Sequence, residues 1–430
     1  EACREVQSLT RCAKQNSWCT FVESMKGKTS LSHVWSVIRS LNGKRSPPMA
    51  RNTVLEHGGR SFVTDTAKAD VFIKHYASVS RHKFSRAERR VDRGVRVRLT
   101  EDRRNPEPLG PESDDFSMEE LVASLKAGKG KGAEGPDGLA PQFLKNLGEV
   151  ARSFMLDTFN KSWREGVCPQ SWRDAVIVPI LKPGKPQGQL DSYRPIALTS
   201  CLAKVMERMV SKRLQHLAES RGMLNSDQSG FRPQRSTEDQ VIRLSQAISD
   251  GFQKKKPPDR TVLALLDFSK AYDKVWRADL LATMLRKGVP VRYVRWIQGF
   301  LSNRQARGRL NRAYCRTWVM REGMPQGSVL APLLFLFVID DLQDRLPEGV
   351  HSSLFADDSA LWVHSPKKEE AVPVLQEGVR EVYRWARAKK LTLNLKKCEV
   401  SFFSPDPHEA KWKPVVVVKG TQLAFNPRPK

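Results

Sequence analysis

The order of apolar and polar residues along the chain predicts a mixture of strands and helices. An unbroken apolar run, Val262–Leu266, stops at Asp267 and predicts a strand that is buried on both faces. Helical spacing of apolar residues follows from Ser269 to Arg286, so we expect Asp267 at the mouth of a strand–helix junction. Because strands and helices do not alternate strictly along the chain, the pattern favours an α+β fold.

Other segments carry equally local signals. Ser117 and Glu120 form the capping-box pattern of a helix that ends near Gly128. Ala175–Leu181 is a β-branched run that leads into the lysine-containing turn Lys182–Lys185, so it predicts a strand. The segments Leu202–Leu217 and Val329–Ile339 are typical of helices, and we expect the second helix to be fully buried.

Two adjacent carboxylates, Asp357 and Asp358, lie between apolar runs and predict a hairpin with acidic residues at its tip. Like charges on a buried sheet repel, and a divalent cation offsets that repulsion. Together with Asp267 they suit a two-Mg²⁺ site for phosphoryl transfer. Successive strand residues face opposite sides, so we expect Asp357, rather than Asp358, to face Asp267. The pair Asp340–Asp341 follows an apolar helix, and we interpret it as structural.

Composition narrows the partner. The 430 residues suffice for about three domains, and 73 Lys and Arg against 47 Asp and Glu give a net charge of +26. Such an excess favours a polyanion, with nucleic acid ahead of an anionic membrane surface. The 40% hydrophobic content is too high for a disordered basic arm.

Several classes of protein are excluded. The longest apolar stretch, Val329–Ile339, has eleven residues and is too short to cross a bilayer. The chain starts at Glu1 without a leader, so we expect an excised fragment without a native start. Seven scattered cysteines lack the spacing of a zinc site and indicate reduced thiols in an intracellular protein.

Residues 1–110 are interpreted as an N-terminal extension and a basic linker. Ser32–Ile38 has helical spacing, whereas the basic run Arg81–Arg104 and the proline-rich residues after it predict a linker. The charge of this run suits either phosphate contacts or a merely solvated connector. The glycine-rich segment Gly128–Gly138 lacks the spacing of a nucleotide-binding P-loop.

Three ordered motifs resemble those of reverse transcriptases of non-LTR (LINE-type) retrotransposons, and we assign the chain to the ingi-like clade of these. Leu266–Asp273 is similar to motif A, Gly323–Pro332 to motif B and Phe355–Asp358 to motif C. Further similarities, dense from about residue 130 to 403, extend to the fingers motifs and to motif D; these segments are Leu181–Gly184, Tyr193–Leu198, Ser229–Thr237 and Leu391–Cys398.

The resemblance implies a right-hand polymerase fold and a role for each site residue. It implies that Asp267 and Asp357, supported by Asp358, ligate catalytic Mg²⁺, with Mn²⁺ as the alternative ion. The resemblance further implies that Lys182 and Arg194 hold the triphosphate and that Tyr272 excludes a 2′-OH. It implies that the turn at Gln326 and Gly327 approaches the nucleotide or template closely and that Lys397 protonates the leaving pyrophosphate. Arg232 and Arg235 would contact the template or primer. Lys182 and Arg194 equally suit solvated surface cations, and Tyr272 suits a core position.

Departures from the family pattern leave every catalytic group in place. Tyr272 stands where many members have Phe, Cys398 where Thr is common, and Pro373 interrupts the helical stretch between motifs C and D. After a terminal hairpin the chain stops at Lys430, so we expect the thumb, and the endonuclease usually found upstream, to be missing.

We therefore expect fingers at 111–260, a palm at 261–403 and a terminal hairpin at 404–430. The expected function is RNA-directed DNA polymerisation in target-primed retrotransposition, with template RNA, primer DNA and dNTPs as partners, in the nucleus or in a ribonucleoprotein. No membrane partner is expected, and the sequence leaves the oligomeric state open. The alternatives are an inactive remnant that binds RNA without polymerising, and another palm polymerase such as a maturase or a telomerase-like enzyme.

Overall fold

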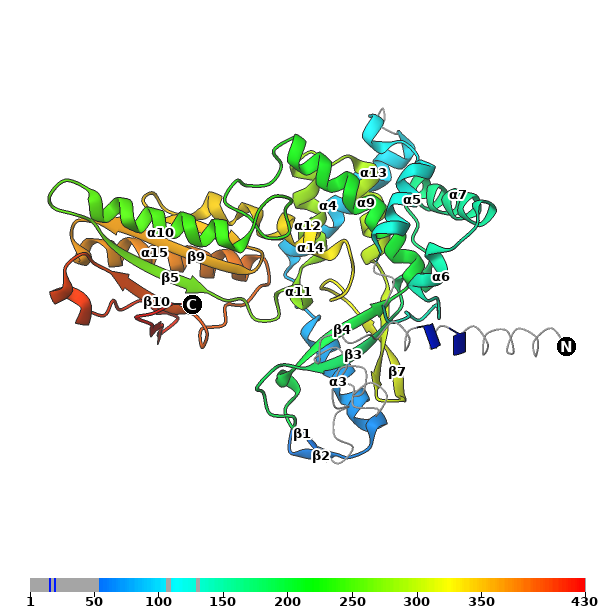
Figure 1. Ribbon diagram of the computed structural model, residues 1–430, viewed down its shortest axis with the longest axis horizontal. Helices are drawn as coiled ribbons and strands as arrows, with labels where there is room; N and C mark the ends of the chain where they lie inside the picture. The colour runs from blue at the N-terminus through cyan, green and yellow to red at the C-terminus, as the bar shows by residue number, and fades with distance from the viewer. Residues whose placement is uncertain (1–14, 17–18, 21–53, 106–109, 129–131, 430) are drawn as a thin grey trace. The chain divides into compact units, whose positions relative to one another are not determined.

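The computed structural model describes residues 15–16, 19–20, 54–105, 110–128 and 132–429 (Figure 1). The chain divides into two compact units, Glu1–Val54 and Leu55–Lys430. The named strands and helices belong to the second unit, beginning with the small hairpin β1 (Leu55–His57) and β2 (Arg60–Phe62). The helix expected at Ser32–Ile38 lies outside the described residues.

A five-stranded sheet contains the run that ends at Asp267. Its strand order is β13–β10–β5–β9–β8, and the central β5 is antiparallel to both of its neighbours. The bounds are β5 Arg260–Leu266, β8 His351–Phe355, β9 Asp358–Ser365, β10 Glu399–Phe403 and β13 Ala424–Phe425. Helices α10 (Thr237–Gln253) and α15 (Lys368–Ala388) pack against this sheet (Figure 1). The predicted strand at Val262–Leu266 and the predicted acidic hairpin are confirmed.

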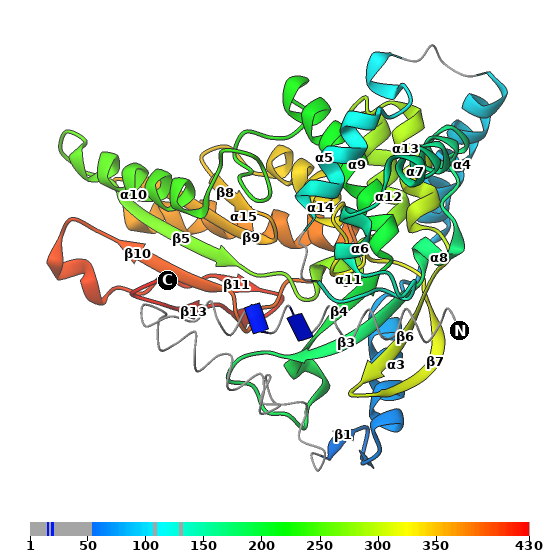
Figure 2. The same ribbon diagram turned by 45° about the vertical axis from the view of Figure 1, so that its right-hand side comes forward.

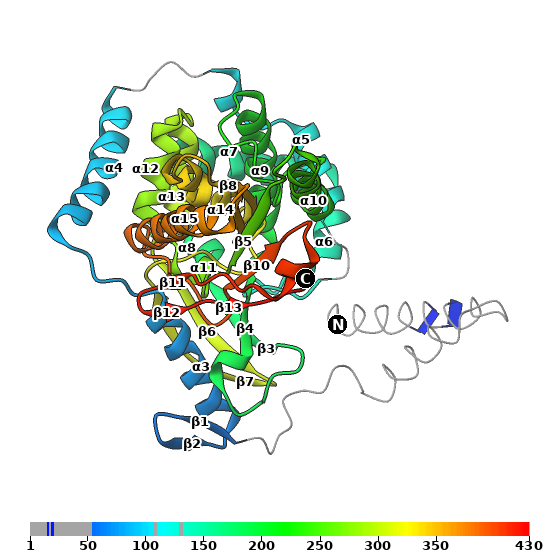
Figure 3. The same ribbon diagram turned by 90° about the vertical axis from the view of Figure 1, so that its left-hand side faces the viewer.

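A second sheet has four strands in the order β4–β3–β6–β7 (Figure 2). Its bounds are β3 Ala175–Leu181, β4 Tyr193–Thr199, β6 Arg304–Leu310 and β7 Ala313–Met320. Strand β3 is antiparallel to β4 and parallel to β6, so segments more than a hundred residues apart form one sheet. Helix α3 (Asp65–Val79) packs on β6 and β7 (Figure 3).

A helical layer surrounds the buried helix α14 (Ala331–Ile339), in which no residue from Leu333 to Ile339 is more than 4% exposed. The predicted helices at Ser117–Gly128, Leu202–Leu217 and Val329–Ile339 are confirmed. The remaining bounds are α4 Arg86–Arg104, α5 Met118–Ala127, α6 Pro141–Lys145, α7 Glu149–Glu165, α8 Gln170–Arg173, α9 Cys201–Ser220, α11 Ala271–Lys274, α12 Arg277–Arg286 and α13 Val291–Leu301, with 3₁₀ turns at Pro111–Ser113, Leu190–Ser192, Asp340–Arg345 and Pro407–Lys411.

The linker predicted at Arg81–Arg104 is wrong for most of its length. Ser85 caps helix α4 because its hydroxyl accepts from the backbone N–H of Glu88, and the Glu88 carboxylate accepts from that of Ser85. Val95 and Leu99, four residues apart, are buried where α4 packs on α12 and α13. The arginines occupy the outer face, so their number hid an amphipathic helix.

Three further expectations concern local breaks. The helical stretch Ser269–Arg286 is divided into α11 and α12 at Val275–Trp276. Pro373 does not interrupt the chain, because α15 runs through it with buried residues such as Ala371 and Leu375 on either side. The terminal hairpin is confirmed by the pairing of β11 (Val417–Val418) with β12 (Thr421–Gln422).

Among the described helices, none has the length and apolar character that crossing a membrane requires.

Candidate active site

Asp267 lies directly after β5 and is held by the loop Leu391–Cys398. The Asn394 side-chain amide donates to Asp267 Oδ2 at 3.0 Å, and the Asn394 backbone N–H donates to the Asp267 carbonyl at 2.8 Å. Lys397 Nζ lies 3.5 Å from Asp267 Oδ1. The loop that resembles motif D is therefore bound to the end of the central strand.

The other two carboxylates come from the hairpin of β8 and β9. Phe355 pairs with Asp358, so Ala356 and Asp357 form a two-residue turn. The last pair between β5 and β9 joins Leu266 to Ser359, and continuing that register puts Asp358 opposite Asp267. The sheet thus brings the three predicted aspartates to one edge.

The charges of these carboxylates act on one another. Burial raises the pKa of Asp357 and of Asp358, and the neighbouring charge of Asp267 raises both further. Lys397 opposes this effect at both residues. Because Asp267 acts on both, the choice of Asp357 over Asp358 stays a prediction.

The donor set suits a hard divalent cation. Carboxylate oxygens are the ligands that Mg²⁺ prefers, and a cation would relieve the repulsion that raises these pKa values. In the part of the chain that the structure describes, no three His, Cys, Asp or Glu side chains already converge as a ligand group. The chemistry of the residues therefore fits the ion, while the Asp267 carboxylate is meanwhile occupied by Asn394 and Lys397.

Four cations gather beside the carboxylates and form what we call the cation cluster: Lys182, Arg194, Lys270 and Lys397. Burial lowers the pKa of the Lys182 ammonium, and the charges of the other three lower it further. Lys182 Nζ donates to the Asp191 carbonyl at 2.8 Å, and Lys270 Nζ to its carboxylate at 2.7 Å. Sequence reasoning missed Lys270, although it lies inside the segment that resembles motif A.

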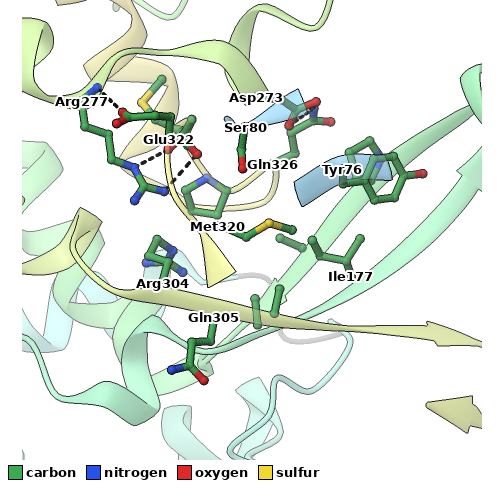
Figure 4. Close-up of a pocket in the computed structure, with 17 residues that line it drawn as sticks. Tyr76, Ser80, Ile177, Asp273, Arg277, Arg304, Gln305, Met320, Glu322 and Gln326 are labelled. Atoms are coloured by element: carbon green, nitrogen blue, oxygen red, sulfur yellow. Dashed lines mark hydrogen bonds between the residues drawn. The ribbon is translucent and has the colours of Figure 1, made fainter. Parts of the chain in front are cut away.

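The loop that resembles motif B is fixed from two sides. Gln326 Nε2 donates to both carboxylate oxygens of Asp273 at 3.0 Å each (Figure 4). Its carbonyl accepts from the backbone N–H of Ala197 on β4 at 2.7 Å. Gly327 has φ +131°, and a Cβ there would lie 2.5 Å from the Ala197 carbonyl oxygen. Glycine is therefore required at position 327 because the loop lies close to strand β4.

A small cavity of about 50 Å³ lies behind this loop (Figure 4). Asp273, Arg277, Arg304 and Glu322 are among its lining residues, whereas the three aspartates of the hairpin and of β5 are not. Burial raises the pKa of Asp273 to about 6 and lowers that of Arg277 to about 10. The cavity therefore lies beside buried charged groups, and the three predicted aspartates do not line it.

Tyr272 shows features of both interpretations. Its ring stacks on Phe335 of α14, with ring centroids 4.7 Å apart, as a core residue would. Burial and then the charge of Asp357 raise its pKa, so the phenol lies near the Ala356–Asp357 turn. Its buried hydroxyl has no hydrogen-bond partner within the described residues.

The two arginines expected at the template differ in their surroundings. Arg232 forms a bidentate pair with Glu219, at 2.8 and 2.6 Å, and donates to the Asn225 carbonyl at 2.6 Å. Its side chain is only 5% exposed, so the structure gives it a structural role in holding its loop. Arg235 is half-buried and donates to the carbonyls of Ser226 and Gln228.

Two positioning residues escaped sequence reasoning. Buried Gln228 accepts through Oε1 from the backbone N–H groups of Gly230, at 2.7 Å, and Ala356, at 2.9 Å. Glu207 of α9 accepts from Ser328 and from the N–H groups of Val329 and Leu330 at the start of α14. The only sequence signal was a charged residue on an apolar helix face at position 207.

The adjacent aspartates Asp340 and Asp341 are structural, as predicted. Asp340 accepts from the backbone N–H of Asn225 at 2.6 Å and pairs with Lys287. Asp341 accepts from the Trp385 indole at 2.9 Å and pairs with Lys389 at 2.8 Å. Protein groups therefore satisfy both carboxylates.

The segment that contains these features matches a known family. Residues 180–418 match the family described as "Reverse transcriptase (RNA-dependent DNA polymerase)". The chain belongs to this family. The mixed sheets and helices are thus those of the palm and fingers of a reverse transcriptase.

Curated relatives come from transposable elements of Drosophila melanogaster. The chain is 34% identical over 288 residues to "Probable RNA-directed DNA polymerase from transposon BS", covering 65% of this chain and 31% of the relative. It is 30% identical over 287 residues to "RNA-directed DNA polymerase from mobile element jockey", with coverages of 65% and 31%. It is 26% identical over 369 residues to "Probable RNA-directed DNA polymerase from transposon X-element", with coverages of 85% and 39%.

These matches support the resemblance to non-LTR reverse transcriptases. The chain spans about a third of the length of the relatives it matches. The ingi-like assignment stays a prediction.

Proposed function

We propose that this reverse-transcriptase chain is the RNA-directed DNA polymerase of a non-LTR retrotransposon, which joins dNTPs to a primer 3′-OH on an RNA template. The observation that carries the proposal is the adjacency of three carboxylates to the cation cluster. Lys397 of the cation cluster links the two groups, since its ammonium lies 3.5 Å from Asp267. Carboxylates that lie beside several cations suit a metal-dependent transfer to a triphosphate.

Asp267 and Asp357, supported by Asp358, would hold Mg²⁺, with Mn²⁺ as the alternative. When bound, the two ions supply activation of the primer hydroxyl and charge stabilisation of the leaving oxygens. Lys182 and Arg194, joined by Lys270, would orient the triphosphate, Arg194 by a forked contact and the lysines as point charges.

Selection and positioning of the nucleotide would fall to residues around the hairpin turn. Tyr272, whose ring is fixed by stacking on Phe335, would exclude a 2′-OH by its bulk. Gln326 and Gly327 would border the nucleotide from the motif B loop. Lys397 would give a proton to the leaving pyrophosphate, because an ammonium beside the carboxylates is a suitable acid there.

We extend the proposal to the element's wider role. Target-primed retrotransposition would use template RNA and primer DNA, held largely through phosphates by the basic surface. A nuclear or ribonucleoprotein location belongs to the same proposal. Arg235 stays a proposed template contact, whereas Arg232 is proposed to hold the loop. Fingers at 111–260 and a palm at 261–403 remain proposed boundaries; β6 and β7, from the second range, share a sheet with β3 and β4.

The test compares primer extension with RNA binding in the 430-residue chain. Asp267→Asn and Asp357→Asn should abolish Mg²⁺-dependent extension on an RNA template and leave RNA affinity within about twofold, because neither change removes a cation. Asp344→Asn, at an exposed carboxylate outside the site, is the matched control. Extension by either site variant would contradict the site, and RNA binding without extension by the unmodified chain would favour an inactive remnant.

A further inference from the structure

The hairpin of β6 and β7 has one covered face and one open face. Ala306 and Leu310 are 2% and 4% exposed on the covered face. Between them, a Cβ at Gly308 would lie 2.8 Å from the Ala69 carbonyl oxygen of α3. Because side chains alternate along a strand, Arg307 and Arg309 project from the opposite face.

Three arginines of this hairpin have no acidic partner among the residues that the structure describes. In the described parts of the chain, Arg307, Arg309 and Arg312 form no ion pair with any carboxylate. The Arg307 guanidinium lies 4.4 Å from the ring centroid of Tyr314, a residue that is 43% exposed. We call Arg307, Arg309 and Tyr314, together with Arg312 in the turn between the two strands, the basic hairpin face. Arg316, by contrast, lies 3.5 Å from Asp70 of α3.

This face lies on the same side of the four-stranded sheet as Arg194 of the proposed nucleotide site. Arg307 is in register with Val176 of β3, and Ile180 of β3 is in register with Arg194 of β4. Residues 176 and 180 share a face, so Arg307 and Arg194 lie on the same side of the sheet. At about 3.3 Å per residue and about 4.8 Å per strand, they are separated by roughly 13 Å along the strands and roughly 10 Å across them.

We propose that the basic hairpin face binds a single-stranded stretch of the RNA template a few nucleotides from the incoming dNTP, an inference that rests on the proposed function. Three cations that no carboxylate of the described residues neutralises match the phosphates of a single strand. An exposed tyrosine beneath a guanidinium offers a stacking surface for an unpaired base, and duplex RNA cannot use such a surface without unstacking.

The experiment measures the affinity of the full chain for a fluorescent single-stranded RNA oligonucleotide at several salt concentrations. Arg307→Gln, Arg309→Gln and Arg312→Gln combined should lower the slope of log affinity against log salt by about 2, since each lost phosphate contact removes about 0.7 on a single strand. Tyr314→Ala should weaken binding by about fivefold or more through lost stacking, with little change of slope.

Two controls separate this surface from general charge. Arg316→Gln, on the α3 side of the same hairpin, should change affinity by less than about twofold, and the affinity for blunt duplex RNA should be insensitive to Tyr314→Ala. Equal losses in the Arg316 variant, or unchanged single-strand binding in the Tyr314 variant, would overturn the inference. Unchanged thermal unfolding shows that each variant is folded.

The proposal and the polymerase function fail in different ways. If the unmodified chain extends a primer but the hairpin variants bind single-stranded RNA normally, the surface assignment is wrong and the function stands. If the chain does not extend a primer but the variants lose single-strand affinity, the surface stands without the polymerase. Preferential loss of binding to anionic lipid vesicles, with RNA affinity retained, would overturn the assignment of the partner.

Discussion

Gln326 donates its side-chain amide to both oxygens of the Asp273 carboxylate, each 3.0 Å away. The acceptor is therefore a charged group whose protonation state sets how firmly the amide is held. Burial raises the pKa of Asp273 to about 6, partly opposed by the Gln326 hydrogen bond. A change of pH within the ordinary experimental range thus acts on the motif B loop.

We predict that the dNTP KM rises as pH falls through about 6. The protonated carboxyl becomes a donor and offers Gln326 one good acceptor instead of two. Because the folded-state pKa lies above the ordinary value of 3.8, protonation occurs in the folded protein at mildly acidic pH. Steady-state extension from pH 5 to 8 measures this effect. Asp273→Asn should flatten the KM profile, and an unchanged profile in that variant would contradict the role.

Gln228 is predicted to position the turn Ala356–Asp357, which carries a proposed metal ligand. Gln228→Ala leaves the N–H groups of Gly230 and Ala356 without their acceptor. A buried donor without a partner costs about 1–3 kcal/mol, so we expect kcat to fall about tenfold while KM changes less. Gln215→Ala is the control, since the Gln215 amide donates to the carbonyl of Phe231, close to Gly230 in the sequence, in an exposed environment. Equal effects of the two substitutions would refute a specific role.

Glu409 is predicted to fasten the C-terminal segment to the central sheet. Its carboxylate accepts from Arg260 at 2.9 Å and from Lys368 at 3.0 Å, and the Arg260 contact above all lowers its pKa to about 2. The depressed pKa means that the stabilisation is present above the ordinary value of 4.5 and is lost as pH falls from there towards 2.

Thermal unfolding between pH 3 and 8 tests this link. Glu409→Gln should lower Tm at pH 7, and the difference from the unmodified chain should shrink towards pH 3. Glu377→Gln removes an exposed pair with Arg384 and should have little effect at either pH. A Glu409 effect that does not depend on pH would show that packing, rather than charge, provides the stability.

The strand before Asp267 and the acidic hairpin could be predicted because their signals are local. An apolar run that ends at a carboxylate, and two acids between apolar runs, contain their geometry within a few residues. The helix at Arg86–Arg104 was missed because only Val95 and Leu99 mark its buried face among many arginines.

The partners of the site residues could not be predicted in this way. Asn394 binds Asp267 across 127 residues, and Gln228 binds Ala356 across 128. Such pairs can be identified only when the strand order is known, because the sequence around each polar residue contains no sign of its distant partner. Arg232 shows a different limit: its position in a motif predicts a template contact, but its guanidinium forms an ion pair with Glu219 of the same chain.

The turn that carries Asp357 has a consequence for how disturbances reach the site. Ala356 has a φ of +57°, and a side chain in this left-handed region costs roughly 1–2 kcal/mol. The turn keeps this conformation because the Gln228 side chain accepts from the backbone N–H of Ala356, while the Ser229 backbone N–H donates to the Leu354 carbonyl in the adjoining strand β8. A disturbance at Gln228 would let the turn relax and would move the Asp357 carboxylate while the sheet stays folded. Glycine at position 356 would release the turn from that dependence, because it adopts the left-handed conformation without help.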